Sequence, residues 1–151
     1  MAAKTRVTVA SLALSASALV GIAVNEGYIG QAYKDVVGVP TIGFGETQGV
    51  TAGQKTDPVR ALIKLEESAS TIAKSMAACI KVPVSQNEYD AYVSFSYNLG
   101  PGAFCKGIAP KLNALDYEAA CKAILQYDHA GGKVYPGLTR RRQEEFAKCS
   151  G

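Results

Sequence analysis

The hydrophobic pattern of the chain starts with a long uncharged stretch. Lys4 and Arg6 precede it, residues 7–24 carry no charged side chain, and Glu26 follows soon afterwards. As one helix this stretch would be about 27 Å long, which is barely enough to cross the hydrocarbon core of a bilayer. Many of its residues are Ala, Ser or Gly, which gain little free energy from lipid. We therefore expect a segment that inserts into a membrane only marginally.

Three interpretations of residues 7–24 are open. The cations in front of them and a passable cleavage site at Ala16-Ser17-Ala18 fit a signal peptide that is removed after export. The run is also rich in alanine, the best helix former, which fits a buried helix of a soluble protein. The small residues are explained best by a third interpretation, a weak anchor that can leave the membrane. In that case the cations keep the N-terminus in the cytoplasm and everything after the anchor lies outside.

The next part of the chain has the pattern of a β-hairpin. Residues 31–34 and 39–44 are rich in β-formers and read as two short strands, with a turn at residues 35–38 between them. Pro40 cannot donate a hydrogen bond to a central strand, so its strand should lie at an edge. We expect a small hairpin subdomain here.

After the hairpin the spacing of apolar residues becomes helical. Asp57-Pro58 is typical of a helix start, with Asp as the cap and Pro in the first turn, and the periodic pattern runs to about Cys79. This helix would be roughly 35 Å long, the length of a connection between two lobes.

Shorter helices should follow this long one. Ser85 and Glu88 form the pattern of a capping box, and the helix that it opens should stop at the Gly-Pro-Gly of residues 100–102. The other helices are predicted at residues 110–115, 116–127 and 139–148, with Gly131-Gly132 breaking the chain between the last two. A small hairpin followed by clustered helices indicates an α+β, mostly helical domain.

Charge and cysteines limit the class of protein. A net charge of +3 suits an anionic polymer such as a cell wall and is too weak to favour nucleic acid. The cysteines lack C-x-x-C spacing and His129 is the single histidine, so neither a metal nor another cofactor is expected. An exported chain should form two disulfides, with the pairing open, whereas a cytosolic one would keep buried thiols. The four cysteines are Cys79, Cys105, Cys121 and Cys149.

The candidate chemistry lies around the predicted hairpin. Glu26 follows the apolar stretch, Asp35 lies in the turn, and Thr41 lies on the returning strand. The hairpin folds Asp35 towards Thr41, and a helix end that feeds it could hold Glu26 across a cleft. An inverting glycosidase needs such an acid and base on the two sides of the scissile bond, with space for water. The spacing alone also fits a solvated Glu and a turn-forming Asp.

The sequence around these three residues resembles the signature of the phage lysozyme (endolysin) family. The family pattern E-G, Y-x-D and T-x-G-x-G corresponds here to Glu26-Gly27, Tyr33-Lys34-Asp35 and Thr41-Ile42-Gly43-Phe44-Gly45. Later segments agree in the same order, with SFSYNLG at residues 94–100, AGGK at 130–133 and GLTRRRQEE at 137–145. The resemblance thus extends from residue 25 to about residue 149.

This resemblance implies a two-lobed fold and a muramidase activity. We expect residues 1–24 to form a weak signal anchor that refolds as the first helix, 25–56 a β-hairpin catalytic lobe, 57–80 a connecting helix and 81–151 a helical lobe. The reaction expected is hydrolysis of the β-1,4 bond between N-acetylmuramic acid and N-acetylglucosamine in peptidoglycan, by a monomer and with inversion.

The resemblance also implies roles for individual residues. Glu26 would be the general acid that protonates the leaving oxygen. Asp35 would orient water and stabilise positive charge at the anomeric carbon, and Thr41 would hydrogen-bond that water. Tyr97 and Asn98 are expected to line the substrate cleft, although a core aromatic and a helix-end residue would look the same.

One residue departs from the family pattern, and one basic group has no role in the expected reaction. Many relatives carry His after G-x-G, where this chain has Glu46, a second candidate acid. The arginines at 140–142 are read as a solvated or ion-paired face rather than a substrate site.

The position of Glu26 directly after the apolar stretch adds one more expectation. The helix that presents the acid has to be drawn from residues 7–24, so spanning the membrane and presenting Glu26 exclude each other. This resembles the signal-anchor-release endolysins, which are exported to the periplasm tethered and inactive, and are then released. No cysteine precedes Cys79, so inhibition would be positional rather than by thiol exchange. The alternatives are a secreted lysozyme with a cleaved signal peptide, a non-catalytic peptidoglycan-binding module, or a lytic transglycosylase.

Overall fold

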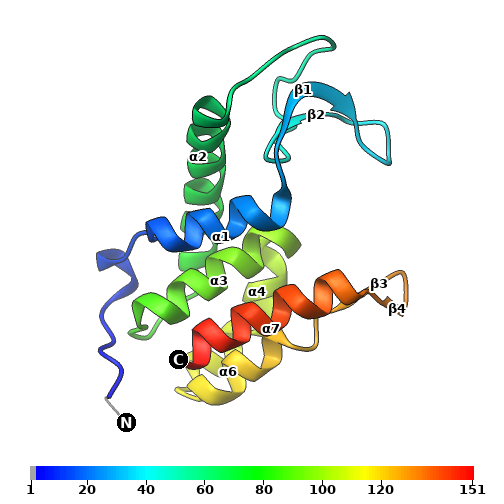
Figure 1. The fold of residues 1–151 in the computed structure, drawn as a ribbon. Coiled ribbons are helices and arrows are strands. Elements are labelled where there is room, and N and C mark those ends of the chain that lie inside the picture. The colour runs from blue at the N-terminus through cyan, green and yellow to red at the C-terminus, as the bar shows by residue number, and fades with distance from the viewer. Residues whose placement is uncertain (1–2) are drawn as a thin grey trace. The chain divides into compact units, whose positions relative to one another are not determined.

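A computed structural model describes residues 3–151, and the chain divides into two compact units (Figure 1). One unit is Ala16–Ala69. The other combines the stretch up to Ser15 with Ser70–Gly151, so it is built from two separate parts of the chain. The long helix α2, Pro58–Ala77, contains the division between them.

The Ala16–Ala69 unit begins with helix α1, Ala16–Glu26, followed by the expected hairpin. Strand β1, Ile29–Lys34, pairs antiparallel with β2, Pro40–Gly43, and Lys34 lies opposite Pro40. Asp57 caps α2 as the sequence predicts, because its Oδ1 accepts hydrogen bonds from the amides of Val59 and Arg60 at 3.0 Å each. The prediction of a hairpin followed by a long helix is confirmed.

Residues 7–24 do not form the single helix that was expected. A 3₁₀ turn covers Val9–Ser11, and α1 starts only at Ala16. Residues 7 and 8 are extended because the backbone of Val7 finds a partner elsewhere: Val7 and Val84 exchange two hydrogen bonds of 3.0 and 2.9 Å. Within residues 3–151, none of the helices combines the length and the apolar character needed to cross a bilayer.

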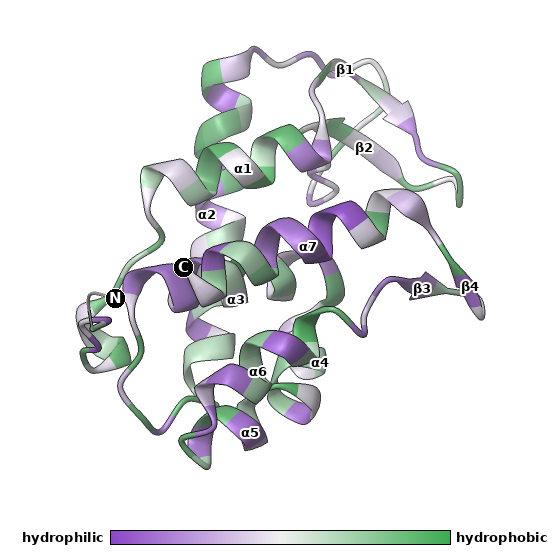
Figure 2. Cartoon of the chain, turned by 60° about the horizontal axis from the view of Figure 1, so that its bottom comes forward, coloured by the Kyte–Doolittle hydropathy of each residue, from purple (hydrophilic) through white to green (hydrophobic). Residues whose placement is uncertain are grey.

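The other unit is helical, with α3 (Gln86–Leu99), α4 (Pro101–Gly107), α5 (Ala109–Asn113), α6 (Tyr117–Ile124) and α7 (Pro136–Ser150). The capping box predicted at Ser85 and Glu88 is present. Its buried core includes Tyr92, whose ring centroid lies 5.0 Å from that of Phe104. Figure 2 shows α7 as a largely hydrophilic helix, although part of it is buried.

Two elements of this unit differ from the sequence prediction. Gly100 and Pro101 end α3 as expected, but Pro101 also starts α4, since proline is well tolerated in a first helical turn. Gly131 and Gly132 do not simply break the chain. Both have positive φ and form the turn of a two-stranded ladder between β3, His129–Ala130, and β4, Lys133–Val134.

Two disulfides lie within the same unit. Cys79 pairs with Cys105, and Cys121 pairs with Cys149. The expectation of two disulfides is therefore confirmed, and the pairing that the sequence left open is between neighbours in chain order.

Candidate active site

Glu26 is the last residue of α1, and glycines shape its surroundings. Gly27 has φ of +73°, which ends the helix there. A Cβ atom on Gly45 would lie 3.5 Å from Glu26 Oε2, so the turn after β2 closely approaches the carboxylate. Gly43 lies against α2, where a Cβ would be only 2.9 Å from that of Ala61. Gly43 thus lets the hairpin pack closely against α2, whereas Gly45 is favoured by its backbone conformation, with φ of +84°.

Asp35 lies directly after β1 and organises the hairpin turn. Its Oδ1 accepts hydrogen bonds from the amides of Val37 and Val39, at 2.9 and 2.8 Å. Its own amide donates to the Val39 carbonyl at 3.0 Å. These bonds use one carboxylate oxygen and fix the side chain on a tight loop, while Oδ2 takes no part in them.

Thr41 lies on β2 opposite Tyr33 and is buried. Its hydroxyl donates to the same Val39 carbonyl that the Asp35 amide contacts, at 3.0 Å. The main chain of Asp35 and the side chain of Thr41 therefore meet at one oxygen atom. Because its proton is committed to Val39, the Thr41 hydroxyl faces any further partner as an acceptor.

Glu46 does not have the surroundings of a proton donor. Its Oε1 accepts from the amides of Thr47 and Gln48, at 3.0 and 2.8 Å, and its Oε2 accepts from the Ser68 hydroxyl at 2.9 Å. These contacts tie the loop after the hairpin to α2. Glu46 therefore has a structural role here, and Glu26 stays the stronger candidate for the acid.

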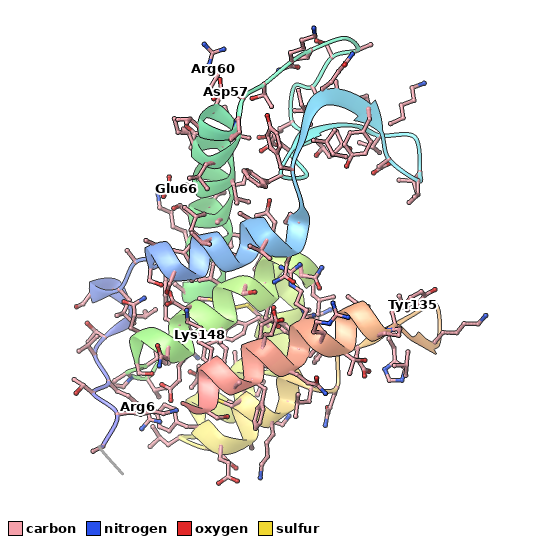
Figure 3. The ribbon with its side chains drawn as sticks, in the orientation of Figure 1. Arg6, Asp57, Arg60, Glu66, Tyr135 and Lys148 are labelled. Atoms are coloured by element: carbon pink, nitrogen blue, oxygen red, sulfur yellow. A yellow bond between two sulfur atoms is a disulfide. The ribbon has the colours of Figure 1, made fainter. Side chains whose placement is uncertain are left out.

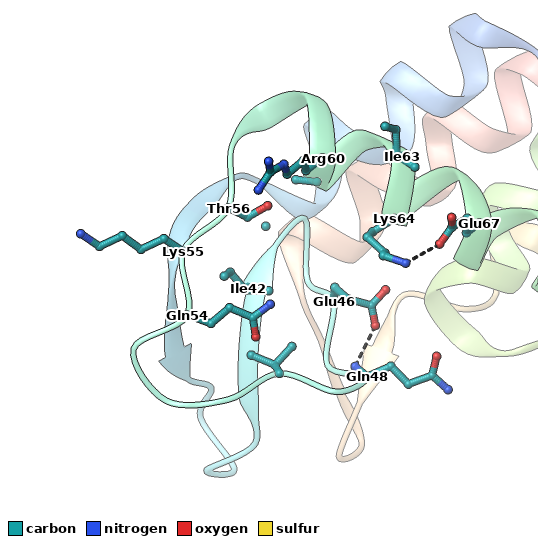
Figure 4. A pocket seen from close by; sticks show the side chains of 13 residues that line it. Ile42, Glu46, Gln48, Gln54, Lys55, Thr56, Arg60, Ile63, Lys64 and Glu67 are labelled. Atoms are coloured by element: carbon teal, nitrogen blue, oxygen red, sulfur yellow. Dashed lines mark hydrogen bonds and ion pairs between the residues drawn. The ribbon is translucent and has the colours of Figure 1, made fainter.

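A cavity of about 320 Å³ lies between that loop and the first turns of α2 (Figure 4). Ile42 and Ile63 contribute to an apolar lining, and Lys64 and Glu67 form an ion pair at 2.7 Å beside it. The lining does not include Glu26, Asp35 or Thr41.

The two residues predicted to bind substrate lie in the other unit, near the end of α3. Tyr97 is half-buried and Asn98 is exposed. Their role in substrate binding stays a prediction. In the described part of the chain, His, Cys, Asp and Glu side chains form no group of three that could hold a metal ion.

A buried charged cluster on α7 was only partly anticipated. Arg141 and Arg142 are 6% and 0% exposed, and both contact Glu145, with Arg142 Nε 2.8 Å from its Oε2. Ser94 of α3 donates to Glu145 Oε1 at 2.7 Å. The expectation of ion pairing is confirmed for these two arginines, but the expectation of a solvated face is wrong for them. The R-R-x-x-E spacing, which puts Glu145 one turn after both arginines, was the signal for this pairing.

Comparisons with known proteins agree with the signature found in the sequence. The model of the phage lysozyme family matches residues 23–145. The SAR-endolysin of Pseudomonas phage phiKMV is 33% identical, over 89% of this chain and 86% of its own length. The endolysin of Salmonella phage P22 is 31% identical, over 87% of this chain and 94% of its own. Among solved structures, an endolysin from Escherichia coli O157:H7 phage FAHEc1 has a TM-score of 0.83 at 31% identity, covering 91% of this chain and 93% of that one.

Proposed function

The chain belongs to the phage lysozyme family and is a peptidoglycan-hydrolysing endolysin, and on that premise we propose that Glu26, Asp35 and Thr41 are its catalytic residues. The observation that supports this most is the meeting of the Asp35 amide and the Thr41 hydroxyl at the carbonyl of Val39. This shared contact brings the main chain of Asp35 and the hydroxyl of Thr41 to the same carbonyl of the hairpin turn.

In the proposed reaction, Asp35 and Thr41 orient the attacking water. The hydroxyl of Thr41 donates to Val39, so it accepts one hydrogen of the water, and Asp35 Oδ2 accepts the other. A lone pair of the water oxygen then points towards the anomeric carbon, and Asp35 takes the proton as the C–O bond forms. Attack by water on the face opposite the leaving group inverts the anomeric configuration.

Glu26 supplies the proton on the other side of the bond. Its carboxyl group protonates the glycosidic oxygen as the sugar departs, which avoids the release of an alkoxide.

Glu26→Gln tests the assignment of the acid. We expect muralytic activity to fall by at least about a hundredfold, the usual contribution of general acid catalysis, with no change in the unfolding curve. Glu46→Gln is the matched control, because an amide oxygen can still accept the loop bonds, and it should stay active in a zymogram. An active Glu26→Gln variant together with an inactive Glu46→Gln variant would move the assignment to Glu46. Wild-type activity in both variants would reject an acid at either position.

The configuration of the product tests the role of water. NMR of freshly released reducing ends should show the α-anomer first. An initial β-anomer would indicate a covalent or substrate-assisted route, and an anhydro product would indicate a lytic transglycosylase.

We also propose that residues 7–24 tether the exported enzyme to the inner membrane of the host until it is released into the periplasm as a monomer. The composition of the stretch and the SAR-endolysin relatives support this. The intact mass of the periplasmic protein tests it. A full-length mass supports the retained anchor, and loss of the segment up to about Ala18 supports an ordinary signal peptide.

A further inference from the structure

The stretch from Lys4 to Ser15 docks along one side of the helical unit. Val7 pairs with Val84 just before α3. Further along, Gln86 Nε2 donates to the carbonyl of Ala13 at 2.8 Å. At the end of the stretch, the amide and the hydroxyl of Ser15 both donate to Asp90, at 3.1 and 2.6 Å. The stretch is thus held at several points by the beginning of α3.

The basic end of this stretch meets a fully buried carboxylate. Arg6 Nε lies 3.2 and 3.0 Å from the two oxygens of Glu88, and its NH2 group lies 2.6 Å from Oε1. The guanidinium also stacks on Tyr117, 3.6 Å from the ring centroid. Lys4 Nζ lies 3.8 Å from Glu88 and donates to the Cys149 carbonyl at 2.6 Å. Figure 3 shows Arg6 on the N-terminal stretch, beside the helices of the same unit.

Glu88 depends on this partner. Its side chain is 0% exposed, and besides the basic residues it is bonded to the Ser85 amide at 2.8 Å. A buried carboxylate without a cation is strongly unfavourable, because the desolvation of the charge is no longer compensated. Bidentate contact with a stacked guanidinium is a geometry that only arginine provides.

In the tethered state Arg6 and Glu88 cannot meet. The cations that precede the membrane segment stay on the cytoplasmic side, and Glu88 lies far beyond the segment on the outer side. A hydrocarbon core of about 30 Å then separates them.

We propose that Glu88, Tyr117 and Asp90 form a receptor for residues 4–15, and that capture of Arg6 by Glu88 holds the released enzyme away from the membrane. This rests on the proposed tether. The same cations act twice, first to orient the anchor in the membrane and then to lock it to the folded enzyme. Release is therefore favoured by a specific charged contact as well as by the weak hydrophobicity of the anchor.

Two variants of the full-length chain test the receptor from its two sides. Arg6→Lys keeps the positive charge needed for orientation but loses the bidentate and stacking contacts. Glu88→Gln leaves the N-terminal stretch untouched. Both should be exported and tethered like the wild type. After depolarisation by an uncoupler, the ratio of soluble to membrane-bound enzyme should fall about tenfold, which corresponds to about 1.4 kcal/mol.

Ser85→Ala is the matched control. It removes the hydroxyl of the capping box but leaves the charge of Glu88 and its bonds to Arg6, so release should stay near that of the wild type. Arg6→Lys and Glu88→Gln remove the same contact. The released fraction of the double variant should therefore be no lower than that of the single variant that is released less.

Purified released protein gives a second measurement that needs no membrane. Trypsin should cut after Lys4 and Arg6 at least about tenfold faster in Glu88→Gln than in the wild type, while the rest of the chain stays intact. Digestion throughout the chain would show that Glu88→Gln is unfolded. In that case the same measurement on Arg6→Lys, which leaves α3 to α7 unchanged, tests the receptor.

The outcomes separate the receptor from the tether. Wild-type enzyme that never sediments with membranes overturns the tether itself. Wild-type enzyme that is tethered and released, with both variants released to the same extent and cut at the same rate, overturns the receptor alone.

Discussion

On α7 one buried carboxylate is paired with two buried guanidinium groups. Glu145 contacts Arg141 and Arg142, and Arg142 also lies over the ring of Phe95, 5.3 Å from its centroid. Burial raises the pKa of Glu145, although both arginines and Ser94 act in the opposite direction. Burial likewise lowers the pKa of Arg142. Such a cluster is held together only while every partner is present.

Glu145→Gln should therefore destabilise the protein by about 3 kcal/mol, because it leaves a buried guanidinium without its counter-charge. Chemical denaturation measures this. The neighbouring Glu144 is exposed, and Glu144→Gln should change the unfolding free energy by no more than about 0.5 kcal/mol. Equal stabilities of the two variants would show that the cluster contributes nothing.

Glu88 gives the stability a dependence on pH. Burial alone would raise its pKa, but the hydrogen bonds from Arg6 and the Ser85 amide, together with the charges of Arg6 and Lys4, outweigh burial, and the pKa is lowered. The folded protein thus binds this proton less tightly than the unfolded chain does. The contribution to stability is complete above the ordinary Glu pKa of about 4.3 and is lost as the pH falls through the lowered value.

The difference in unfolding free energy between wild type and Glu88→Gln should accordingly be largest near neutral pH and shrink below about pH 4. Urea titrations of both proteins across this range measure it. A difference that stays constant, or grows towards acid pH, contradicts the ion pair.

Among the helices and strands, the sequence predicted those features that depend on residues close together in the chain. The Asp57 cap, the capping box of α3 and the hairpin turn all involve residues within a few positions of each other. Glu88 shows where such prediction stops. Its bond to Ser85 follows from the capping-box pattern, whereas its bond to Arg6 joins positions 82 apart and no local pattern indicates it. The extended conformation of residues 7 and 8 was missed for the same reason.

The candidate catalytic residues were accessible from the sequence because a family signature surrounds them. Spacing alone could not distinguish Glu26 from the other carboxylates of the chain. The meeting of Asp35 and Thr41 at the Val39 carbonyl depends on the exact register of the hairpin, which the sequence pattern does not encode at that resolution.

Helix α1 offers a test of the weak anchor. Ala16 and Gly21 are exposed, and a side chain on Gly21 would meet nothing within 4 Å. Changing both to Leu should strengthen insertion by about 0.5 kcal/mol or more per position without disturbing the folded enzyme. Ala18 is buried, so a change there would confuse the result.

The double Leu variant should stay with the membrane after depolarisation and fail to lyse cells. The double Gln variant at the same two positions, of similar length but polar, should be released. Normal release of the Leu variant, measured by fractionation, contradicts the role of this helix in the tether.

At the scale of the whole molecule, both disulfides lie in one unit and the proposed catalytic residues lie in the other. Replacing Cys79 and Cys105 by Ala should lower the unfolding free energy by about 3 kcal/mol, since a loop of 26 positions is no longer closed. Hydrolysis measured well below the unfolding temperature should remain near that of the wild type. Faster hydrolysis on reduction would instead reveal a thiol switch.

The partners of the N-terminal stretch are synthesised long after the stretch itself. The two residues are 145 positions apart, and Arg6 and Glu88 are 82 apart. At a synthesis rate of about 5–20 residues per second, the ribosome adds Glu88 roughly 4 to 16 seconds after Arg6, and Cys149 roughly 7 to 30 seconds after Lys4. During that interval the N-terminal stretch has emerged and its docking surface has not yet been made. If residues 7–24 act as the proposed anchor, the membrane therefore has no competitor when the stretch first leaves the ribosome. The order of synthesis would then favour insertion into lipid before the more specific contact exists.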